Sequence, residues 1–169
     1  SSRLGGLLKR VRPGLDGCSD DFHVGSEVRG QEIERMLTLN MAATVKITHH
    51  FIKAMKKRGS GRILNVASVA AFHPIPSMDI YAATKAFVLS FTESLAENYR
   101  PDGIFITALC PGITNTRMAE QDLIKNAPDF LILGPEEVAR EGYEALMNRE
   151  VLSIPGPANR LALGIAKHQ

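Results

Sequence analysis

Two short apolar runs constrain the fold of this chain more than any other feature. Residues 62–67 have the sequence Arg-Ile-Leu-Asn-Val-Ala, and residues 103–110 have the sequence Gly-Ile-Phe-Ile-Thr-Ala-Leu-Cys, which Pro111-Gly112 ends. Short β-branched runs of this kind are typical of strands that are buried on both faces of a parallel sheet. A strand, a helix and a second strand in this order make a βαβ unit, whose crossover is almost always right-handed. We therefore expect an α/β protein.

Turn and helix signals place further elements around these strands. Pro135, followed by Glu136 and Glu137, is typical of the first turn of a helix, where a missing amide hydrogen is tolerated and acidic groups favour the helix dipole. Residues 1–26 are ambiguous and are predicted to be an irregular segment, and residues 27–169 a single domain. The predicted elements are helices over about 27–58, 80–99 and 135–148 and strands at 62–67, 104–109 and 151–154.

Tyr81 and Lys85 lie four residues apart in the second predicted helix, thirteen residues after Ser68. On an α-helix, residues with this spacing share a face. A cation beside a phenol favours the phenolate and lowers the phenol pKa, which is about 10 in isolation. A tyrosine tuned in this way can act as a general acid/base on an alcohol or carbonyl oxygen. The spacing alone is equally compatible with a solvated lysine over a packed ring.

Several segments of the sequence together match one known pattern. They are Asn40 in the first predicted helix, Ser68 after a strand, Tyr81-Ala82-Ala83-Thr84-Lys85, and Pro111-Gly112-x-x-x-Thr116. In these segments the chain resembles the second half of the short-chain dehydrogenases/reductases, over about residues 32–160. The resemblance implies a partial Rossmann-like fold, a doubly wound parallel sheet flanked by helices, with ligands bound at the carboxyl ends of the strands.

The resemblance implies an NAD(P)-dependent oxidoreductase with a role for each matching residue. Tyr81 would be the catalytic acid/base, and Ser68 would orient and polarise the substrate oxygen. Lys85 would lower the tyrosine pKa and hold the ribose hydroxyls of the nicotinamide nucleotide. Asn40 would shape its helix so that its backbone carbonyl anchors a water molecule of the proton relay.

The resemblance also implies which residues hold the nicotinamide half of NAD or NADP. They are Tyr81, Lys85, Pro111, Gly112, Ile113 and Thr116. The sequence contains no strand followed by a glycine-rich turn and a helix, the arrangement that cradles a pyrophosphate. The residue that would select NAD or NADP would lie in the same missing segment. The resemblance therefore covers the catalytic half of the family domain.

A second argument for Asn40 comes from the periodicity of its helix. Apolar or nearly apolar side chains recur with a period of 3.6 at Ile33, Leu37, Thr44, Ile47 and Phe51. Asn40 falls on this stripe, where burial is expected and an unpaired amide would cost a few kcal/mol. The asparagine is therefore predicted to be functional, and the alternative is an amide that is satisfied in the core.

The segments expected to line a substrate pocket are mostly apolar. They follow Ser68 and Thr116, and their composition favours a hydrophobic carbonyl or alcohol over a sugar or a charged acid. The predicted substrate contacts are Ser68, Phe72, His73 and Met118. For His73, a solvated loop histidine is the alternative.

The helix predicted over 80–99 is apolar on more than one side. Phe87, Phe91 and Leu95 form one row, and Val88, Ala96 and Tyr99 form another. A helix that covers a sheet needs one apolar face. We therefore expect a homodimer or tetramer through the surface of this helix and the helix at 27–58. The alternative is that the helix at 27–58 covers the second row within the same chain.

Composition excludes several other classes. A formal net charge of +2 over 169 residues is too small to argue for nucleic acid. No run of about 18 apolar residues and no signal-peptide pattern is present, so neither a membrane span nor secretion is predicted and a cytoplasmic location is expected. The adjacent His49 and His50 point to different helix faces, so no metal site is expected.

Two functions remain from different classes. The first is an oxidoreductase in which Tyr81 handles the proton. The second is a non-catalytic remnant that keeps the sheet and an interaction surface and acts as a scaffold or subunit-interaction protein. The matching catalytic residues favour the first, and the missing glycine-rich turn favours the second. An extended-type epimerase or dehydratase shares the Tyr-x-x-x-Lys pattern, but the short distance from Thr116 to the end of the chain argues against it.

Overall fold

A parallel sheet of three strands forms the centre of the described structure. The computed structural model describes residues 30–75, 78–115 and 127–164. The strands are β1 (Gly61–Val66), β2 (Ile104–Leu109) and β3 (Leu152–Ser153), in the order β1-β2-β3. Ile63 pairs with Ile106 in the β1–β2 ladder, and Leu109 pairs with Ser153 in the β2–β3 ladder. The predicted α/β class with a parallel sheet is confirmed.

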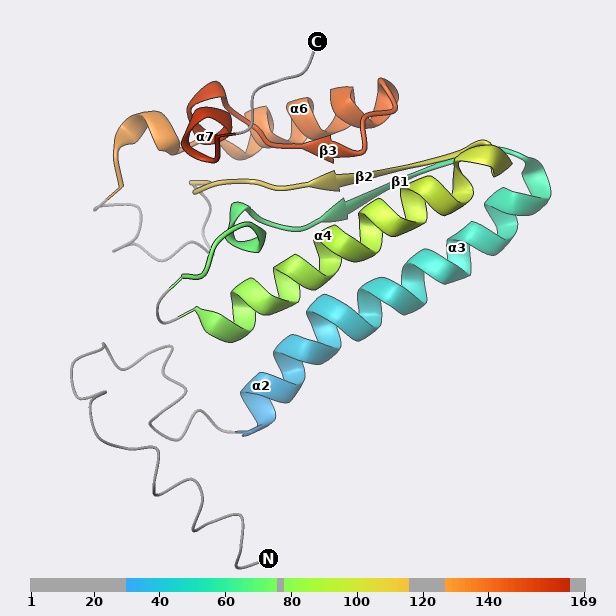
Figure 1. Cartoon of the computed structure of the whole chain (residues 1–169), viewed down its shortest axis with the longest axis horizontal. Coiled ribbons are helices and arrows are strands. Elements are labelled where there is room, and N and C mark those ends of the chain that lie inside the picture. The colour runs from blue at the N-terminus through green and yellow to red at the C-terminus, as the bar shows by residue number, and fades with distance from the viewer. Residues whose placement is uncertain (1–29, 76–77, 116–126, 165–169) are drawn as a thin grey trace, which may run out of the picture.

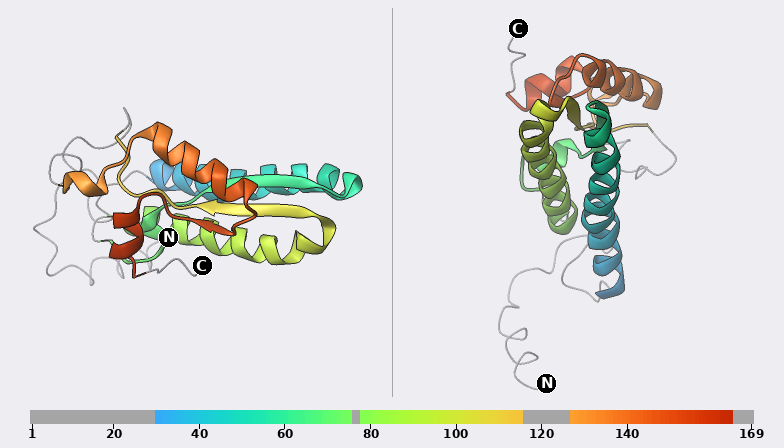
Figure 2. Two further views of the ribbon diagram at one scale, coloured as in Figure 1. Left: turned by 90° about the horizontal axis from the view of Figure 1, so that it is seen from above. Right: turned by 90° about the vertical axis from the view of Figure 1, so that its right-hand side faces the viewer.

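Helices cover both faces of this sheet. Figure 1 shows α3 and α4 on one face and α6 on the other, and Figure 2 shows the same layers from two further sides. The α-helices are α2 (Gly30–Leu37), α3 (Thr44–Arg58), α4 (Asp79–Tyr99), α6 (Pro135–Met147) and α7 (Pro157–Ala162). The π-helix η1 (Thr38–Ala43) joins α2 to α3, and the short 3-10 helices are η2 (Val69–Ala71), η3 (Arg100–Asp102) and η4 (Asp129–Leu131). Residues 1–26, predicted to be irregular, lie outside the described residues.

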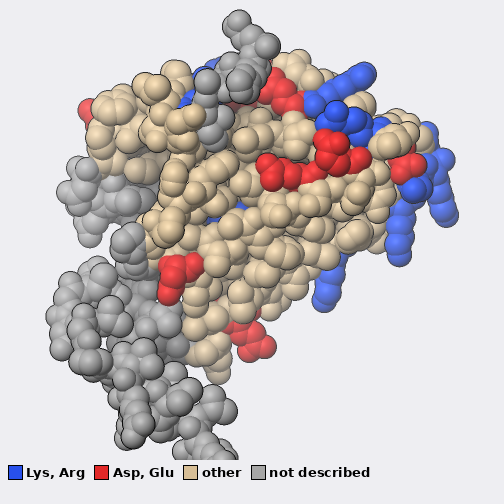
Figure 3. Space-filling model, viewed as in Figure 1, with Lys and Arg blue, Asp and Glu red and all other residues tan. Residues whose placement is uncertain are grey.

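The connection between α3 and β1 depends on two glycines. Gly59 ends α3 with φ +69°, and its N–H donates to the carbonyls of Lys56 and Met55. Gly103 precedes β2 with φ +74°, and a Cβ there would overlap the carbonyl oxygen of Gly59. Both positions lie in the left-handed region that favours glycine. The basic residues in the last turn of α3 gather at this end of the molecule (Figure 3), and Lys56 Nζ lies 2.9 Å from Asp102 Oδ2.

The central strand β2 carries most of the core. Ile104 and Ile106 pack with Ile52, Leu95 and Ala96 of α3 and α4 in one buried cluster. Ala108 and Cys110, at the carboxyl end of the strand, belong to a second buried cluster. The prediction that this strand is buried on both faces is therefore confirmed for 104–109.

The strand β1 is less buried than its sequence predicts. Val66 is 53% exposed, and Arg62 is exposed as well. The physical reason is that β2 pairs with one edge of β1, and within the described ranges no strand pairs with the other edge. A strand edge with free backbone groups needs cover. We therefore expect a further segment to cover the second edge of β1.

The apolar stripe predicted for the first long helix is wrong at Leu37, which is 41% exposed before the π-helix, and at two positions after it. Ile47 and Phe51 are 58% and 53% exposed, whereas Thr48 and Ile52 are buried. The π-helix explains the change, because a π turn contains more residues than an α turn and moves the buried face one position along the chain. A period of 3.6 cannot anticipate such an insertion.

The second apolar row of α4 is covered within the chain. In that row, Ala96 is buried in one cluster with Ile52 of α3, and Lys56 Nζ of α3 lies 5.7 Å from the centre of the Tyr99 ring. The α3 helix therefore shields this side of α4. Of the two explanations for that row, the structure favours packing within one chain, and it removes the row as an argument for an oligomer.

Candidate active site

Ser68 and Pro111 lie side by side where the strands β1 and β2 end. The ladder continues past both strands, because Ala67 N donates to Leu109 O at 2.7 Å and Val69 N donates to Pro111 O at 3.0 Å. Parallel strands present their carboxyl ends at one edge of the sheet, which is where ligands bind in open α/β folds. Figure 1 shows that α4 begins at this same edge.

Ser68 begins the 3-10 helix η2. Its backbone is extended, and its Oγ accepts a hydrogen bond from Ala70 N at 3.1 Å. A hydroxyl that accepts one bond in this way can still donate its own hydrogen. The side chain is half-buried at the mouth of the two strands.

Tyr81 lies in the first turn of α4 and Lys85 in the next turn. Lys85 Nζ lies 5.6 Å from the centre of the Tyr81 ring and donates to Val66 O at 3.1 Å. Burial lowers the pKa of Lys85 below its ordinary value. The ammonium thus lies beside the tyrosine ring, as the four-residue spacing predicts, and a contact that the spacing does not predict holds it at the end of β1. The role of the pair in proton transfer remains a prediction.

Asn40 lies in the π-helix η1 and faces α4. Its Nδ2 donates to Thr84 Oγ1 at 3.0 Å, and its backbone carbonyl accepts from Thr44 Oγ1 at 2.8 Å. Thr84 in turn donates to Tyr81 O at 2.8 Å. π-turns within helices occur frequently at functional sites. Asn40 therefore contacts the helix that carries Tyr81 and Lys85, through a threonine that the sequence analysis did not single out.

The turn after β2 contains Pro111, Gly112 and Ile113, three of the predicted cofactor residues. Gly112 is half-buried, and a Cβ there would come within 2.6 Å of Asn159 Oδ1. Ile113 O accepts from Leu133 N at 3.0 Å. Thr116 lies outside the described residues. The contacts of this turn and of Lys85 with a nicotinamide nucleotide remain predictions.

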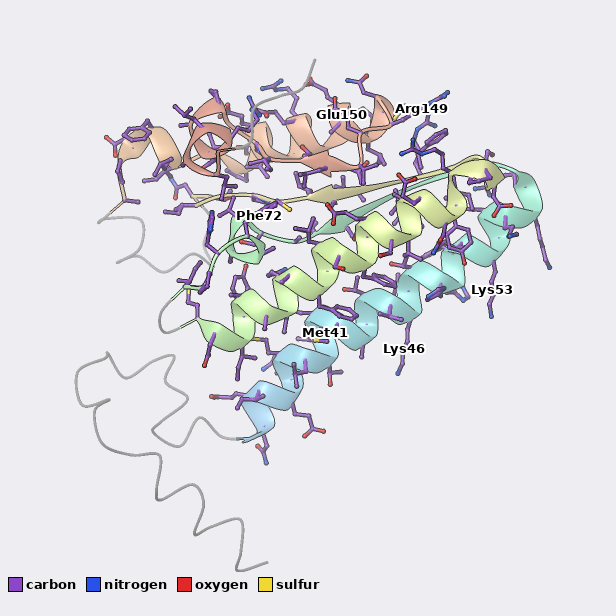
Figure 4. All side chains as sticks on the ribbon, viewed as in Figure 1. Met41, Lys46, Lys53, Phe72, Arg149 and Glu150 are labelled. Carbon is purple, nitrogen blue, oxygen red and sulfur yellow. The ribbon has the colours of Figure 1, made fainter. Side chains whose placement is uncertain are left out.

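The predicted substrate residues are only partly described. Phe72 is half-buried on the η2 loop (Figure 4) and packs against the cluster that contains Ala67 and Cys110. His73 is exposed, and Met118 lies outside the described residues. The contacts of these side chains with a substrate remain predictions.

Within the described ranges no group of three or more metal-ligating side chains occurs. Among these same residues no helix has both the length and the apolar composition needed to cross a membrane.

Cys110 is a buried thiol at the end of β2. Burial raises its pKa to about 12, from an ordinary value of 9.0. The thiolate is the form that reacts with electrophiles. In a Cys18→Ser background we expect native protein to resist iodoacetamide at pH 8, by a factor on the order of 10³, and to react at the rate of a free thiol in urea. Mass spectrometry of labelling time courses measures this, and fast labelling of native Cys110 would contradict its burial.

The same shift predicts a loss of stability at high pH. Because the folded pKa lies above the unfolded one, the contribution of Cys110 is fully present below about pH 8.5. It is lost as the pH rises towards 12, by up to about 1.4 kcal/mol for each pH unit. Urea unfolding between pH 8 and pH 10.5 should show this slope, and Cys110→Ala should flatten it. An equal slope in both proteins would assign it to other groups.

Comparisons with known proteins identify the family. The family model described as short chain dehydrogenase matches residues 17–126 of this chain. The mouse very-long-chain 3-oxoacyl-CoA reductase is 35% identical over 88 residues, which are 52% of this chain and 28% of that protein. The mouse 17-beta-hydroxysteroid dehydrogenase type 3 is 31% identical over 131 residues, which are 70% of this chain and 43% of that protein.

A solved structure agrees with this assignment. The short-chain dehydrogenase from Sphingobium yanoikuyae in complex with NADPH is 25% identical, with a TM-score of 0.73 over 94% of this chain and 66% of that chain. The chain belongs to the short-chain dehydrogenase family. It spans 28% and 43% of the lengths of the two mouse relatives that it matches.

Proposed function

We propose that this chain forms the catalytic half of an NAD(P)-dependent oxidoreductase that interconverts an alcohol and a carbonyl. The observation that carries the proposal is the position of Lys85, 5.6 Å from the centre of the Tyr81 ring and bonded to the end of β1. Ser68 lies beyond the same strand end, next to Pro111. A phenol beside an ammonium can transfer a proton to a carbonyl oxygen, and a nearby hydroxyl can donate a hydrogen bond to that oxygen.

Each residue has a distinct task in this proposal. Tyr81 gives or takes the proton at the substrate oxygen, and Lys85 lies beside its ring, 5.6 Å from the ring centre. Ser68 donates its hydroxyl hydrogen to the same oxygen and orients it. The nicotinamide, when bound, supplies or accepts the hydride at the carbon atom. The turn at Pro111 and Gly112 is the surface that would hold the nicotinamide.

A hydrophobic substrate fits this site better than a charged one. The loop after Ser68 contains Phe72 and Ile75, which are half-buried, and Pro74, which is exposed. The two mouse relatives are named for an acyl-CoA and a steroid, and both names describe compounds with large apolar parts. This agreement supports a hydrophobic carbonyl or alcohol as the substrate class.

Direct titration with NADH and NADPH tests the proposal. We expect nicotinamide fluorescence to report binding at micromolar concentration for one of the two and to select between NAD and NADP. Lys85→Met should weaken that binding, whereas Lys53→Met on the outer side of α3 should leave it unchanged. Absence of binding at millimolar concentration would overturn the proposal for this chain.

A non-catalytic scaffold or subunit-interaction protein is the second candidate. A chain of this kind would keep the sheet and the helical surface and bind no dinucleotide. The same titration separates the two, because the second candidate predicts no response to either nucleotide.

The outer surface of α3 and α4 supports a homodimer. Lys46 and Lys53 point away from the sheet (Figure 4), and Lys57 follows them at helical spacing. On α4, Glu93 and Glu97 are exposed at the same kind of spacing. In a two-fold dimer the same surface of both subunits forms the interface. The basic residues of α3 in one subunit can therefore lie against the acidic residues of α4 in the other.

Reversing the charge on α3 tests this interface. We expect Lys46→Glu together with Lys53→Glu to weaken the dimer at least about tenfold, because like charges across an interface cost several kcal/mol. Arg140→Glu on α6, on the opposite face of the sheet, is the matched control and should leave the dimer intact. Sedimentation velocity at micromolar protein measures both. A wild-type chain that stays monomeric would contradict the proposed dimer.

A further inference from the structure

The hydroxyl of Thr84 links the two helices that carry the candidate site. Thr84 is fully buried on α4, between Tyr81 and Lys85 in the sequence. It donates its single hydrogen to Tyr81 O at 2.8 Å. Its lone pairs are then left for the amide of Asn40, which donates at 3.0 Å. One hydroxyl therefore joins the π-helix η1 to the backbone of the first turn of α4.

The π-helix needs such a partner. A π turn is rare and occurs mostly as a short interruption of an α-helix, so the surrounding structure must hold it in place. Here two hydrogen bonds hold the residue at its centre, one from Thr44 Oγ1 to Asn40 O and one from the Asn40 amide to Thr84. Without Thr84, the half-buried amide of Asn40 would lose the hydrogen-bond acceptor that holds it against α4. Leaving a partly buried polar group without its partner is unfavourable.

We propose that Thr84 is a positioning residue, which keeps the π-helix around Asn40 in register with Tyr81. This inference rests on the proposed oxidoreductase function, to which it adds a residue. Thr84 itself faces the helix interface, and its effect on the reaction passes through Asn40 and through the backbone of Tyr81.

A second threonine on the same helix has the same chemistry and a different partner. Thr92 is fully buried, donates to Val88 O at 2.6 Å and accepts from Asn65 Nδ2 at 3.0 Å. Asn65 Oδ1 in turn accepts from Thr48 Oγ1 at 3.3 Å. This network joins α3, β1 and α4 without touching Asn40. Thr92 is therefore a matched control for Thr84, with an equal loss of bonds and no connection to the π-helix.

The experiment compares Thr84→Val, Thr84→Ser and Thr92→Val in the full chain with its cofactor. Valine keeps the volume of threonine and removes the hydroxyl. We expect Thr84→Val to lower kcat about tenfold or more with KM changed less than about threefold, and Thr84→Ser to restore kcat to within about threefold. Thr92→Val should lower the denaturation midpoint as much as Thr84→Val does and keep kcat within about twofold. An equal fall of kcat in both valine variants would overturn the inference.

A double-mutant comparison tests whether Thr84 acts through Asn40. If it does, Asn40→Ala combined with Thr84→Val should be no more than about twofold slower than Asn40→Ala alone, because coupled residues are not additive. If the two substitutions lower kcat by factors that multiply in the double mutant, Thr84 does not act through Asn40, and the inference is overturned.

Amide hydrogen exchange tests the same coupling without turnover. In Thr84→Val we expect exchange within residues 38–43 to be at least about tenfold faster, and in Thr92→Val to stay within about twofold of the wild type. If the wild-type chain neither binds cofactor nor turns over, the proposed function fails and this measurement still decides the coupling. Unchanged exchange at 38–43 in Thr84→Val would overturn the inference in either case.

Discussion

Replacing Tyr81 by phenylalanine is expected to lower kcat/KM by a factor of about 10² to 10⁴, the range that general acid–base groups contribute. The substitution removes one hydroxyl and leaves the ring against which Lys85 lies, 5.6 Å from its centre. The fold should therefore be preserved while the proton donor is lost. Steady-state kinetics with a hydrophobic ketone and the preferred reduced nicotinamide cofactor measure the effect.

Tyr143→Phe is the matched control for this prediction. Tyr143 is an exposed tyrosine on α6, on the opposite face of the sheet from α4. Its substitution removes the same hydroxyl and should leave kcat/KM within about twofold. Retention of more than a tenth of the activity in Tyr81→Phe would remove the tyrosine from the proposed chemistry, whatever happens in the control.

Replacing Ile104 by alanine is expected to destabilise the fold by about 2–5 kcal/mol, the range measured for deletion of buried isoleucine and leucine side chains. Ile104 is fully buried on the central strand β2 and packs with Ile52 and Leu95. The substitution would leave a cavity between β2 and the helices α3 and α4. The packing of these elements would limit how far the surrounding side chains can move to fill it. Urea unfolding followed by circular dichroism measures the change.

Leu161→Ala on α7 provides the comparison. Leu161 is 81% exposed, so its substitution should change the free energy of unfolding by no more than about 0.5 kcal/mol. An equal effect of the two substitutions would mean that β2 does not carry the core. A destabilisation of less than about 1 kcal/mol in Ile104→Ala would lead to the same conclusion.

The local pattern of the sequence was sufficient to predict the central strand and the juxtaposition of Tyr81 and Lys85. The run at 104–109 is apolar without alternation, and it forms a strand that is buried on both faces. A spacing of four residues on a helix brings two side chains together whatever the rest of the fold does, and Lys85 lies over the Tyr81 ring. Such features depend on neighbours in the chain, which the sequence displays directly.

The long first helix shows where periodicity stops being informative. Ile47 and Phe51 continue the apolar stripe in the sequence and are exposed in the structure, whereas Thr48 and Ile52 are buried. The π turn at Thr38–Ala43 shifts the buried face of the helix, and no residue type in that segment predicts a π turn. Its place depends on the bond between Asn40 and Thr84, two residues that are 44 positions apart.

The amino-acid order thus specifies the α/β class, the buried strand and the tyrosine–lysine pair, because each follows from residues close together in the chain. The partners of Asn40 and Asn65, the exposure of Val66 and the packing of Gly112 on Asn159 follow from contacts between distant segments. Hydrogen bonds between buried side chains need both partners at a fixed separation. That separation exists only after the helices have packed on the sheet.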